Sequence, residues 1–277
     1  MKKILHFILS HSVFIAICAA ALSLQTLQLL HFPCNIYLII FIFFAALCGY
    51  NAYWLLSKFS FNPQTSLLLF LKKQLIYFII SFLAMAGMIY CLLHLHLIWY
   101  NVVITFFLML VYSVPLLPFK QINFTRKAGF VKTILLSFTW AHVTTMIPLQ
   151  ITITHLTIAE ILIYISRFLF ILMLCIIFDK RDMAMDQIRG MHSLATDVSA
   201  KTLHYSMIVI FMLFSIIGIS LVKFGIEYLQ SIGLLITAIA TFILYLYSLK
   251  KRGYFFYYFL VDGLMLFSVF ITYLLSI

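Results

Sequence analysis

The chain has 277 residues, of which 65% are hydrophobic and only 9% are charged. A soluble domain is typically about half apolar and about a quarter charged, so these proportions exclude an ordinary soluble protein. The net charge of +11 could favour nucleic acid, but most of the basic residues lie in short segments that flank the apolar runs. We therefore expect no nucleic-acid partner.

Long apolar runs follow one another along the whole chain. A helix needs roughly 20 apolar residues to cross about 30 Å of hydrocarbon, and runs without alternation are not typical of barrel strands. We predict about nine spans, at residues 7–30, 35–57, 74–93, 96–115, 131–150, 156–178, 203–222, 227–249 and 254–275. No polar stretch between them is long enough for a second domain. Residues 1–277 are therefore predicted to form one polytopic, all-α membrane domain.

The first run also has features of a cleaved signal peptide. Lys2 and Lys3 precede it, and Ala19, Ala20 and Ala21 lie within it. The apolar run is long for a signal peptide, so we favour a retained first helix. The five cysteines are scattered singly in or near the spans without a CxxC pair, which argues against a disulfide framework or a zinc site.

The basic residues gather in alternate connections. They lie before the first predicted span or close to the segments that follow the second, fourth, sixth and eighth: Lys2, Lys3, Lys58, Lys72, Lys73, Lys120, Arg126, Lys127, Lys132, Lys180, Arg181, Arg189, Lys201, Lys250, Lys251 and Arg252. The positive-inside rule then places the N-terminus and these segments in the cytoplasm, and the C-terminus outside. We expect an integral protein of a bacterial cytoplasmic membrane, with some basic side chains on anionic lipid headgroups.

Acidic residues are concentrated after the sixth predicted span. Asp179, Asp182 and Asp186 are spaced i, i+3 and i+7, so they share one face if the helix continues into the cytoplasm. Three such carboxylates repel one another unless a cation lies between them. Aspartate oxygens suit Mg²⁺, which usually completes its shell with water and phosphate. We predict a magnesium–phosphate site; the alternative is a solvated helix end whose aspartates pair with neighbouring basic residues.

Two segments carry a resemblance to a known family. The stretch 178–195 resembles the second aspartate-rich motif of the UbiA superfamily of intramembrane prenyltransferases. The stretch 112–120, followed by Arg126, Gly129, Lys132 and Trp140, is similar to the Tyr-Ser/Thr-x-Pro turn, the basic loop and the fifth helix of that family. The resemblance implies a UbiA-like bundle with a cavity open toward the cytoplasm, Mg²⁺, an isoprenyl diphosphate donor and a lipophilic acceptor.

The first aspartate-rich motif of the family is degenerate here. Asn51 is present, but Ala52, Leu55 and Phe59 stand where the resemblance implies aspartates. A two-metal site is therefore not expected, and one ion on the second motif would leave basic side chains to contact the diphosphate. The predicted substrate-binding residues are Asn51, Lys58, Tyr112, Lys120, Arg126 and Arg181. The alternative for Lys58 is a headgroup anchor, and the candidates for the cavity wall are Trp54, Tyr112 and Trp140.

Three further charged residues fall inside predicted spans. Arg167 follows Glu160 by seven residues on the same helix face, so we expect it to pair with Glu160 or with another helix; contact with an acceptor is the alternative. Asp262, near the cytoplasmic end of the ninth span, either packs between helices or faces the cavity.

The leading interpretation is a Mg²⁺-dependent, UbiA-like prenyltransferase that moves an isoprenyl group from its diphosphate to a lipophilic acceptor. The alternative is a non-catalytic UbiA-like protein that binds a lipid or assists assembly, because the first motif is degenerate. A transporter that uses Arg167 and Asp262 is disfavoured, because the spans hold few polar residues.

Overall fold

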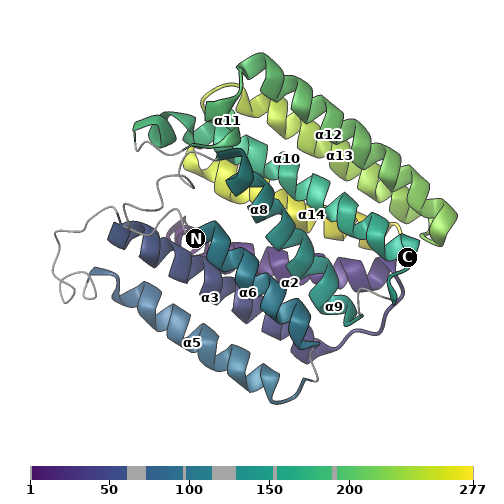
Figure 1. Ribbon diagram of the computed structural model, residues 1–277, viewed down its shortest axis with the longest axis horizontal. Coiled ribbons are helices and arrows are strands. Elements are labelled where there is room, and N and C mark those ends of the chain that lie inside the picture. Colours follow the sequence, from purple (N-terminus) through teal and green to yellow (C-terminus); the bar gives the residue numbers. More distant parts are fainter. Residues whose placement is uncertain are drawn as a thin grey trace.

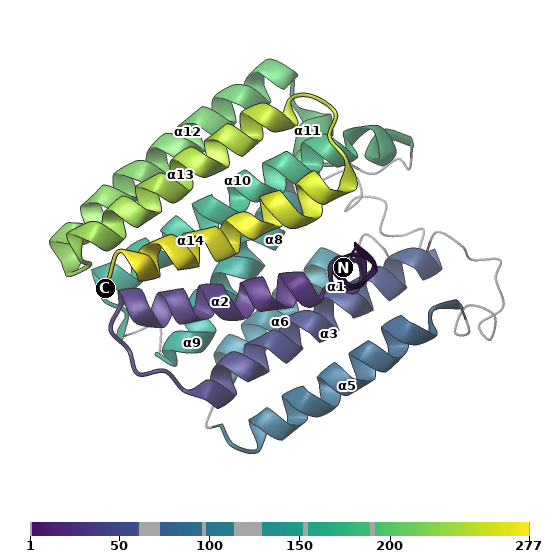
Figure 2. The same ribbon diagram turned by 180° about the vertical axis from the view of Figure 1, so that it is seen from behind.

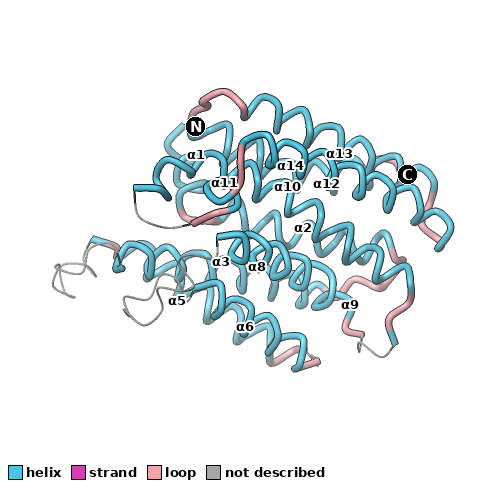
Figure 3. Tube along the Cα trace, turned by 45° about the horizontal axis from the view of Figure 1, so that its top comes forward, coloured by secondary structure: helices cyan, strands magenta, loops and turns pink. Residues whose placement is uncertain are grey.

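The computed structural model describes residues 2–60, 73–95, 98–113, 129–151, 155–188 and 192–276. Within these ranges the regular elements are helices (Figures 1 and 3). In chain order they are α1 (Lys2–Ser10), α2 (Val13–Leu29), α3 (Ile36–Ser60), α5 (Leu75–Leu92), α6 (Trp99–Ser113), α8 (Gly129–Ala141), η3 (His142–Met146), α9 (Ile147–Leu149), α10 (Ile158–Ile188), α11 (Leu194–Asp197), α12 (Ala200–Ser220), η5 (Leu221–Phe224), α13 (Tyr228–Ser248), η6 (Phe256–Val261) and α14 (Asp262–Leu274). The expected all-α architecture is confirmed.

The predicted apolar runs all contain helix in the part of the chain that the structure describes. Within the described ranges, seven helical segments are long and apolar enough to cross a membrane, or up to eight if the bent pair α1 and α2 is one span. Helix α6 has 15 residues and is shorter than a full span. The length and composition of these helices support an integral membrane protein.

The helices lie side by side in one bundle, as both ribbon views show (Figures 1 and 2). Helix α2 packs against α3 and α14, so the first and last spans are neighbours. Helix α10 packs against α8 and α12 and is the most deeply buried of the candidate spans. Helix α5 lies at the edge of the bundle against α3, where Gly87 lets the ring of Phe44 approach: a Cβ at Gly87 would lie 2.5 Å from that ring.

The first predicted span is not one continuous helix. Helices α1 and α2 meet at an angle of 66°. Helix α1 ends where the Ser10 hydroxyl donates to the carbonyl oxygen of Phe7 and the His11 ring bonds the same oxygen, at 3.2 and 3.0 Å. Ser12 then adopts a left-handed conformation with φ of 62°. The chain turns here without the glycine or proline that usually reveals a break.

The sixth helix continues well past the apolar run that predicted it. At 1.5 Å per residue the 31 residues of α10 extend about 46 Å, which exceeds the roughly 30 Å of hydrocarbon. Residues 179–188 therefore continue the helix beyond the predicted apolar run, so Asp179, Asp182 and Asp186 lie on the helical extension that their spacing required. Lys120 and Arg126 lie outside the described residues.

Candidate functional site

The projecting end of α10 is joined to two other helices through Asp179. The hydroxyl of Thr133 in α8 donates to Asp179 Oδ2 at 2.5 Å. The backbone N–H of Leu194, the first residue of α11, also donates to the Asp179 carboxylate. Asp179 therefore ties α8 and α11 to α10 and is not a free, solvated carboxylate.

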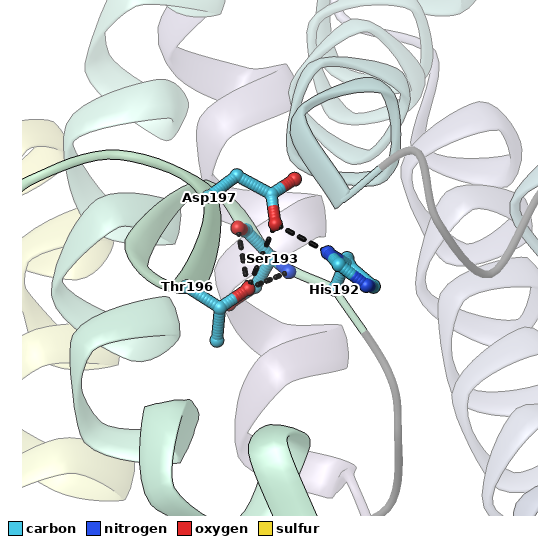
Figure 4. A network of polar contacts seen from close by, with 4 residues as sticks. All are labelled: His192, Ser193, Thr196 and Asp197. Carbon is cyan, nitrogen blue, oxygen red and sulfur yellow. Dashed lines mark hydrogen bonds and ion pairs between the residues drawn. The ribbon is translucent and has the colours of Figure 1, made fainter.

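Helix α11 is a single turn held by its own polar side chains (Figure 4). The hydroxyl oxygen of Thr196 accepts a hydrogen bond from the backbone N–H of Ser193 at 2.8 Å. The Asp197 carboxylate lies 2.6 Å from Nδ1 of His192 and 3.1 Å from the Thr196 hydroxyl. These local bonds orient the first backbone N–H groups of α11, including the one that reaches Asp179.

Asp182 is paired with its own neighbour. Arg181 donates from Nε and from one terminal nitrogen to the two oxygens of Asp182, both at 2.6 Å. The guanidinium carbon of Arg181 also lies 4.8 Å from the ring centroid of Phe178, 5.3 Å from that of Tyr257 and 4.7 Å from that of Tyr258. Aromatic faces attract guanidinium groups, so these rings hold Arg181 in the geometry that binds Asp182.

Lys132 of α8 connects the acidic face of α10 with the aromatic side chains of α3 and α6. It interacts electrostatically with Tyr53 and with all three aspartates of α10. Its Nζ lies 6.0 Å from the ring centroid of Tyr112. Asp186 is buried, with 6% of its surface exposed. A carboxylate buried beside an ammonium group is stabilised by that opposite charge.

Aromatic side chains connect α3 with α6 and with α8 next to Lys132. The rings of Tyr53 and Tyr112 stack with centroids 5.1 Å apart. Deeper in the bundle, the indole N–H of Trp140 donates to the hydroxyl oxygen of Tyr50 at 2.7 Å. The expected wall residues Tyr112 and Trp140 therefore lie in this aromatic region, whereas Trp54 is 37% exposed.

Comparisons with known proteins were made by sequence and by structure. No protein-family model and no curated protein sequence matches the chain. The structure is similar to the apo structure of a UbiA homologue from Aeropyrum pernix K1, with a TM-score of 0.62 over 97% of each chain at 11% identity. It is also similar to a structure of digeranylgeranylglyceryl phosphate synthase, with a TM-score of 0.54 over 99% of this chain and 98% of the other at 14% identity.

The chain has the UbiA fold. This confirms the fold implied by the two sequence segments, and it shows that nearly the whole chain takes part in that fold. At these identities, the shared property is the arrangement of helices.

Two predicted substrate-binding residues of this UbiA fold lie in α3. Asn51 is fully buried, and its amide nitrogen donates to the carbonyl oxygens of Leu47 and His11 at 2.8 and 3.0 Å. It thereby ties α3 to the bend between α1 and α2. Lys58 donates from Nζ to the side-chain oxygen of Gln74 at 2.9 Å and lies 3.9 Å from the ring centroid of Tyr77, so it contacts α5.

The predicted magnesium ligands do not converge in this UbiA fold. Among the described residues, no three His, Cys, Asp or Glu side chains are grouped closely enough to hold a metal ion. Both oxygens of Asp182 accept hydrogen bonds from Arg181, and Asp179 is bound by α8 and α11. Asp182 is therefore held by Arg181, whose positive charge opposes a metal ion at this carboxylate.

Lys132 is the site residue that sequence reasoning did not select. It stood out as one of several basic residues near the start of the fifth predicted span and as part of the segment that resembles the family's basic loop and fifth helix, but it was not selected as a substrate-binding residue. Its position beside Thr133, in the first turn of the fifth predicted helix, could have indicated that it lies near the aspartates. Only the packing of α8 on α10 places it against the aspartates.

Proposed function

We propose that this protein binds an isoprenyl diphosphate at the aspartate-bearing end of α10 and transfers its prenyl group to a lipophilic acceptor. The observation that carries the proposal is the position of Lys132 in a UbiA fold. Lys132 interacts with the acidic face of α10 and lies against the Tyr112 ring. A lysine ammonium group, which suits a diphosphate, therefore lies near an aromatic ring, which suits a prenyl cation.

The proposed reaction depends on stabilising a departing diphosphate. The bond between the first prenyl carbon and oxygen breaks, and its electron pair leaves with the diphosphate. Lys132 disperses part of the charge that develops on the leaving oxygens, as a preorganised ammonium group does in a site with little water. The acceptor nucleophile then attacks the allylic cation and loses its proton.

Aromatic rings would stabilise the allylic cation that the proposed reaction forms. The stacked rings of Tyr53 and Tyr112 lie at the Lys132 end of the interface between α3 and α6. The faces of such rings attract cations and favour the allylic cation over its escape to water. The apolar bundle around them suits a prenyl chain and a lipophilic acceptor.

The test uses the full chain in lipid nanodiscs with labelled isoprenyl diphosphates of several lengths and a panel of quinone-precursor, polyol and porphyrin-like acceptors. We expect saturable diphosphate binding and transfer of label to one acceptor class. Lys132→Met should weaken binding about 10- to 100-fold, because one charge-assisted contact contributes about 1.5–3 kcal/mol. Lys223→Met removes an exposed lysine from η5 and should leave binding unchanged.

Lys132→Arg shows whether weaker binding in Lys132→Met comes from the lost positive charge or from a misfolded protein. This variant should retain most of the binding, because it keeps a cation beside the aspartates. If Lys132→Met binds the diphosphate as tightly as the wild type, then the diphosphate does not bind at this site and the proposal is wrong.

Magnesium dependence at Asp179, Asp182 and Asp186 is a further part of the proposal. Because Arg181 occupies both oxygens of Asp182, Arg181→Met should increase the affinity of the protein for Mn²⁺, measured by electron paramagnetic resonance as a substitute for Mg²⁺. Arg252→Met is the matched control, since Arg252 also lies over aromatic rings but not beside these aspartates. Unchanged Mn²⁺ affinity in Arg181→Met would remove the metal from the proposal.

A non-catalytic protein that binds a prenyl lipid is the second candidate. It is favoured by the degenerate first motif, because Leu55 is buried and Ala52 has no oxygen to offer an ion. Diphosphate binding without transfer to any acceptor would support this function. Ala52→Asp discriminates further: it should raise turnover in an impaired enzyme and have no effect on turnover in a protein that only binds.

A further inference from the structure

Arg167 is a buried cation in the middle of α10, far from the proposed prenyl site. It lies nine residues after the start of the helix, about 13.5 Å along its axis and so near the midplane of a hydrocarbon layer about 30 Å thick. Only 5% of its surface is exposed. An ionised arginine at this depth is costly unless polar or anionic groups surround it.

No carboxylate neutralises Arg167 among the residues that the structure describes. The ion pairs there are Arg181 with Asp182 and His192 with Asp197. Glu160 was one of the two expected partners. Its carboxylate instead accepts a hydrogen bond from the backbone N–H of Thr157 at 2.6 Å. It caps the start of α10, and the expected pair with Arg167 is not formed.

Arg167 donates hydrogen bonds to uncharged groups of α2. This agrees with the second expectation, a partner on another helix. One terminal nitrogen donates to Gln25 Oε1 at 2.8 Å. The other donates to the carbonyl oxygen of Leu22 at 3.2 Å and to the hydroxyl of Thr26 at 3.3 Å. These contacts hold the guanidinium group in place but leave its charge uncompensated.

A small cavity of about 10 Å³ is lined in part by Arg167. Its polar wall consists of Ser166, Arg167 and Ser268, and the rest of its wall is leucine, isoleucine and phenylalanine. That volume is about what one water-sized particle needs. The cavity is therefore too small for a phosphate or the head of a lipid, and a halide ion, which is larger than a water molecule, enters only if the cavity walls move slightly apart.

The polar wall of this cavity presents donors. Within the described part of the chain, Nε of Arg167 is buried and has no hydrogen-bond acceptor. The Ser268 hydroxyl oxygen accepts from Gln25 Nε2 at 3.0 Å, which leaves its proton available to donate. Ser166 adds a second hydroxyl group to the wall. A positive charge with donors and without a carboxylate favours an anion over water or a cation.

We propose that this cavity binds one halide ion, chloride in the cell, through Nε of Arg167 and the hydroxyls of Ser166 and Ser268. The ion neutralises the charge of Arg167 and joins α10 to α14 at the centre of the bundle. The site is independent of the proposed prenyl transfer.

Anomalous diffraction locates the ion directly. Crystals of the full chain grown with bromide in place of chloride should give a bromine peak beside Arg167 Nε. A water only at this position, without an anomalous peak, would overturn the proposal.

Thermal unfolding in detergent tests the same site in solution. At constant ionic strength, a buffer with chloride in place of gluconate should raise the Tm of the wild type. At a chloride concentration ten times its Kd, the ratio of folded to unfolded protein should rise about elevenfold. Arg167→Gln should lose this chloride effect.

Ser166→Val keeps the test decisive if Arg167→Gln does not fold. Valine fills the cavity while it leaves the Arg167 contacts with α2 in place, so the chloride effect should disappear. Ser215→Val, a matched change in α12, should retain it. A chloride effect of equal size in Ser166→Val and the wild type would refute the halide site.

Discussion

Gln25 of α2 links three helices at the centre of the bundle, and its replacement by leucine should destabilise the protein strongly. Its side chain is fully buried. The amide nitrogen contacts the carbonyl and hydroxyl oxygens of Ser268, both at 3.0 Å, and the hydroxyl of Thr272 at 2.9 Å. The amide oxygen accepts from Arg167 at 2.8 Å.

The magnitude of the Gln25→Leu effect follows from these bonds. Two N–H hydrogens serve the α14 contacts, and hydrogen bonds between membrane helices contribute about 0.6 kcal/mol each on average. A hydrogen bond to a charged group contributes about 1.5–3 kcal/mol. We therefore expect a loss of about 3 kcal/mol in the free energy of unfolding, which is more than a hundredfold change in the equilibrium.

Reversible unfolding in mixed micelles of mild detergent and dodecyl sulfate measures this loss. Gln28→Leu is the matched control: its amide bonds the Ser276 hydroxyl near the end of the chain, and the expected loss is below about 1 kcal/mol. Gln25→Glu retains an acceptor and supplies a negative charge, so it should be more stable than Gln25→Leu. Equal losses in Gln25→Leu and Gln28→Leu would refute the reasoning that Arg167 depends on Gln25.

Three further predictions concern packing and helix ends. Gly87→Ala should cost about 1–3 kcal/mol in the same unfolding assay, because the new Cβ would overlap the Phe44 ring; Phe44→Leu should relieve most of that loss. Tyr50→Phe removes the acceptor of the buried Trp140 indole and should cost about 1–3 kcal/mol, with a shift in tryptophan fluorescence; an unchanged spectrum would contradict this bond. Glu160→Ala removes the carboxylate that caps α10 and should lower stability by about 0.5–2 kcal/mol in the same unfolding assay; an unchanged stability would contradict this cap.

Most of the helical architecture could be predicted from the sequence, because a lipid environment allows few alternatives. Each backbone N–H and C=O group in hydrocarbon must be bonded within the chain, so a long apolar run becomes a helix. Long apolar runs predicted the helices, and the cluster of aspartates marked the end of α10. The two family-like segments predicted the UbiA fold, which the structural comparison confirms.

The break between α1 and α2 could not be predicted from composition. Ser10, His11 and Ser12 are compatible with a helix, and the bend depends on bonds that they form with neighbours. One of those neighbours is Asn51 in α3, whose amide binds the His11 carbonyl. Such a contact joins residues 40 positions apart and has no local sequence signal.

The sequence by itself determined which segments are helices and where the charged residues lie along them, because hydrophobicity and spacing are local properties. Tertiary structure decided which charges meet. It brought Lys132 to the acidic face of α10 and bonded Arg167 to α2 rather than to Glu160, whereas the pair of Arg181 and Asp182 joins adjacent residues and was one of the alternatives that the sequence offered. Electrostatic and hydrogen-bond energies fall steeply with distance, so the partner of a buried charge depends on how the helices pack.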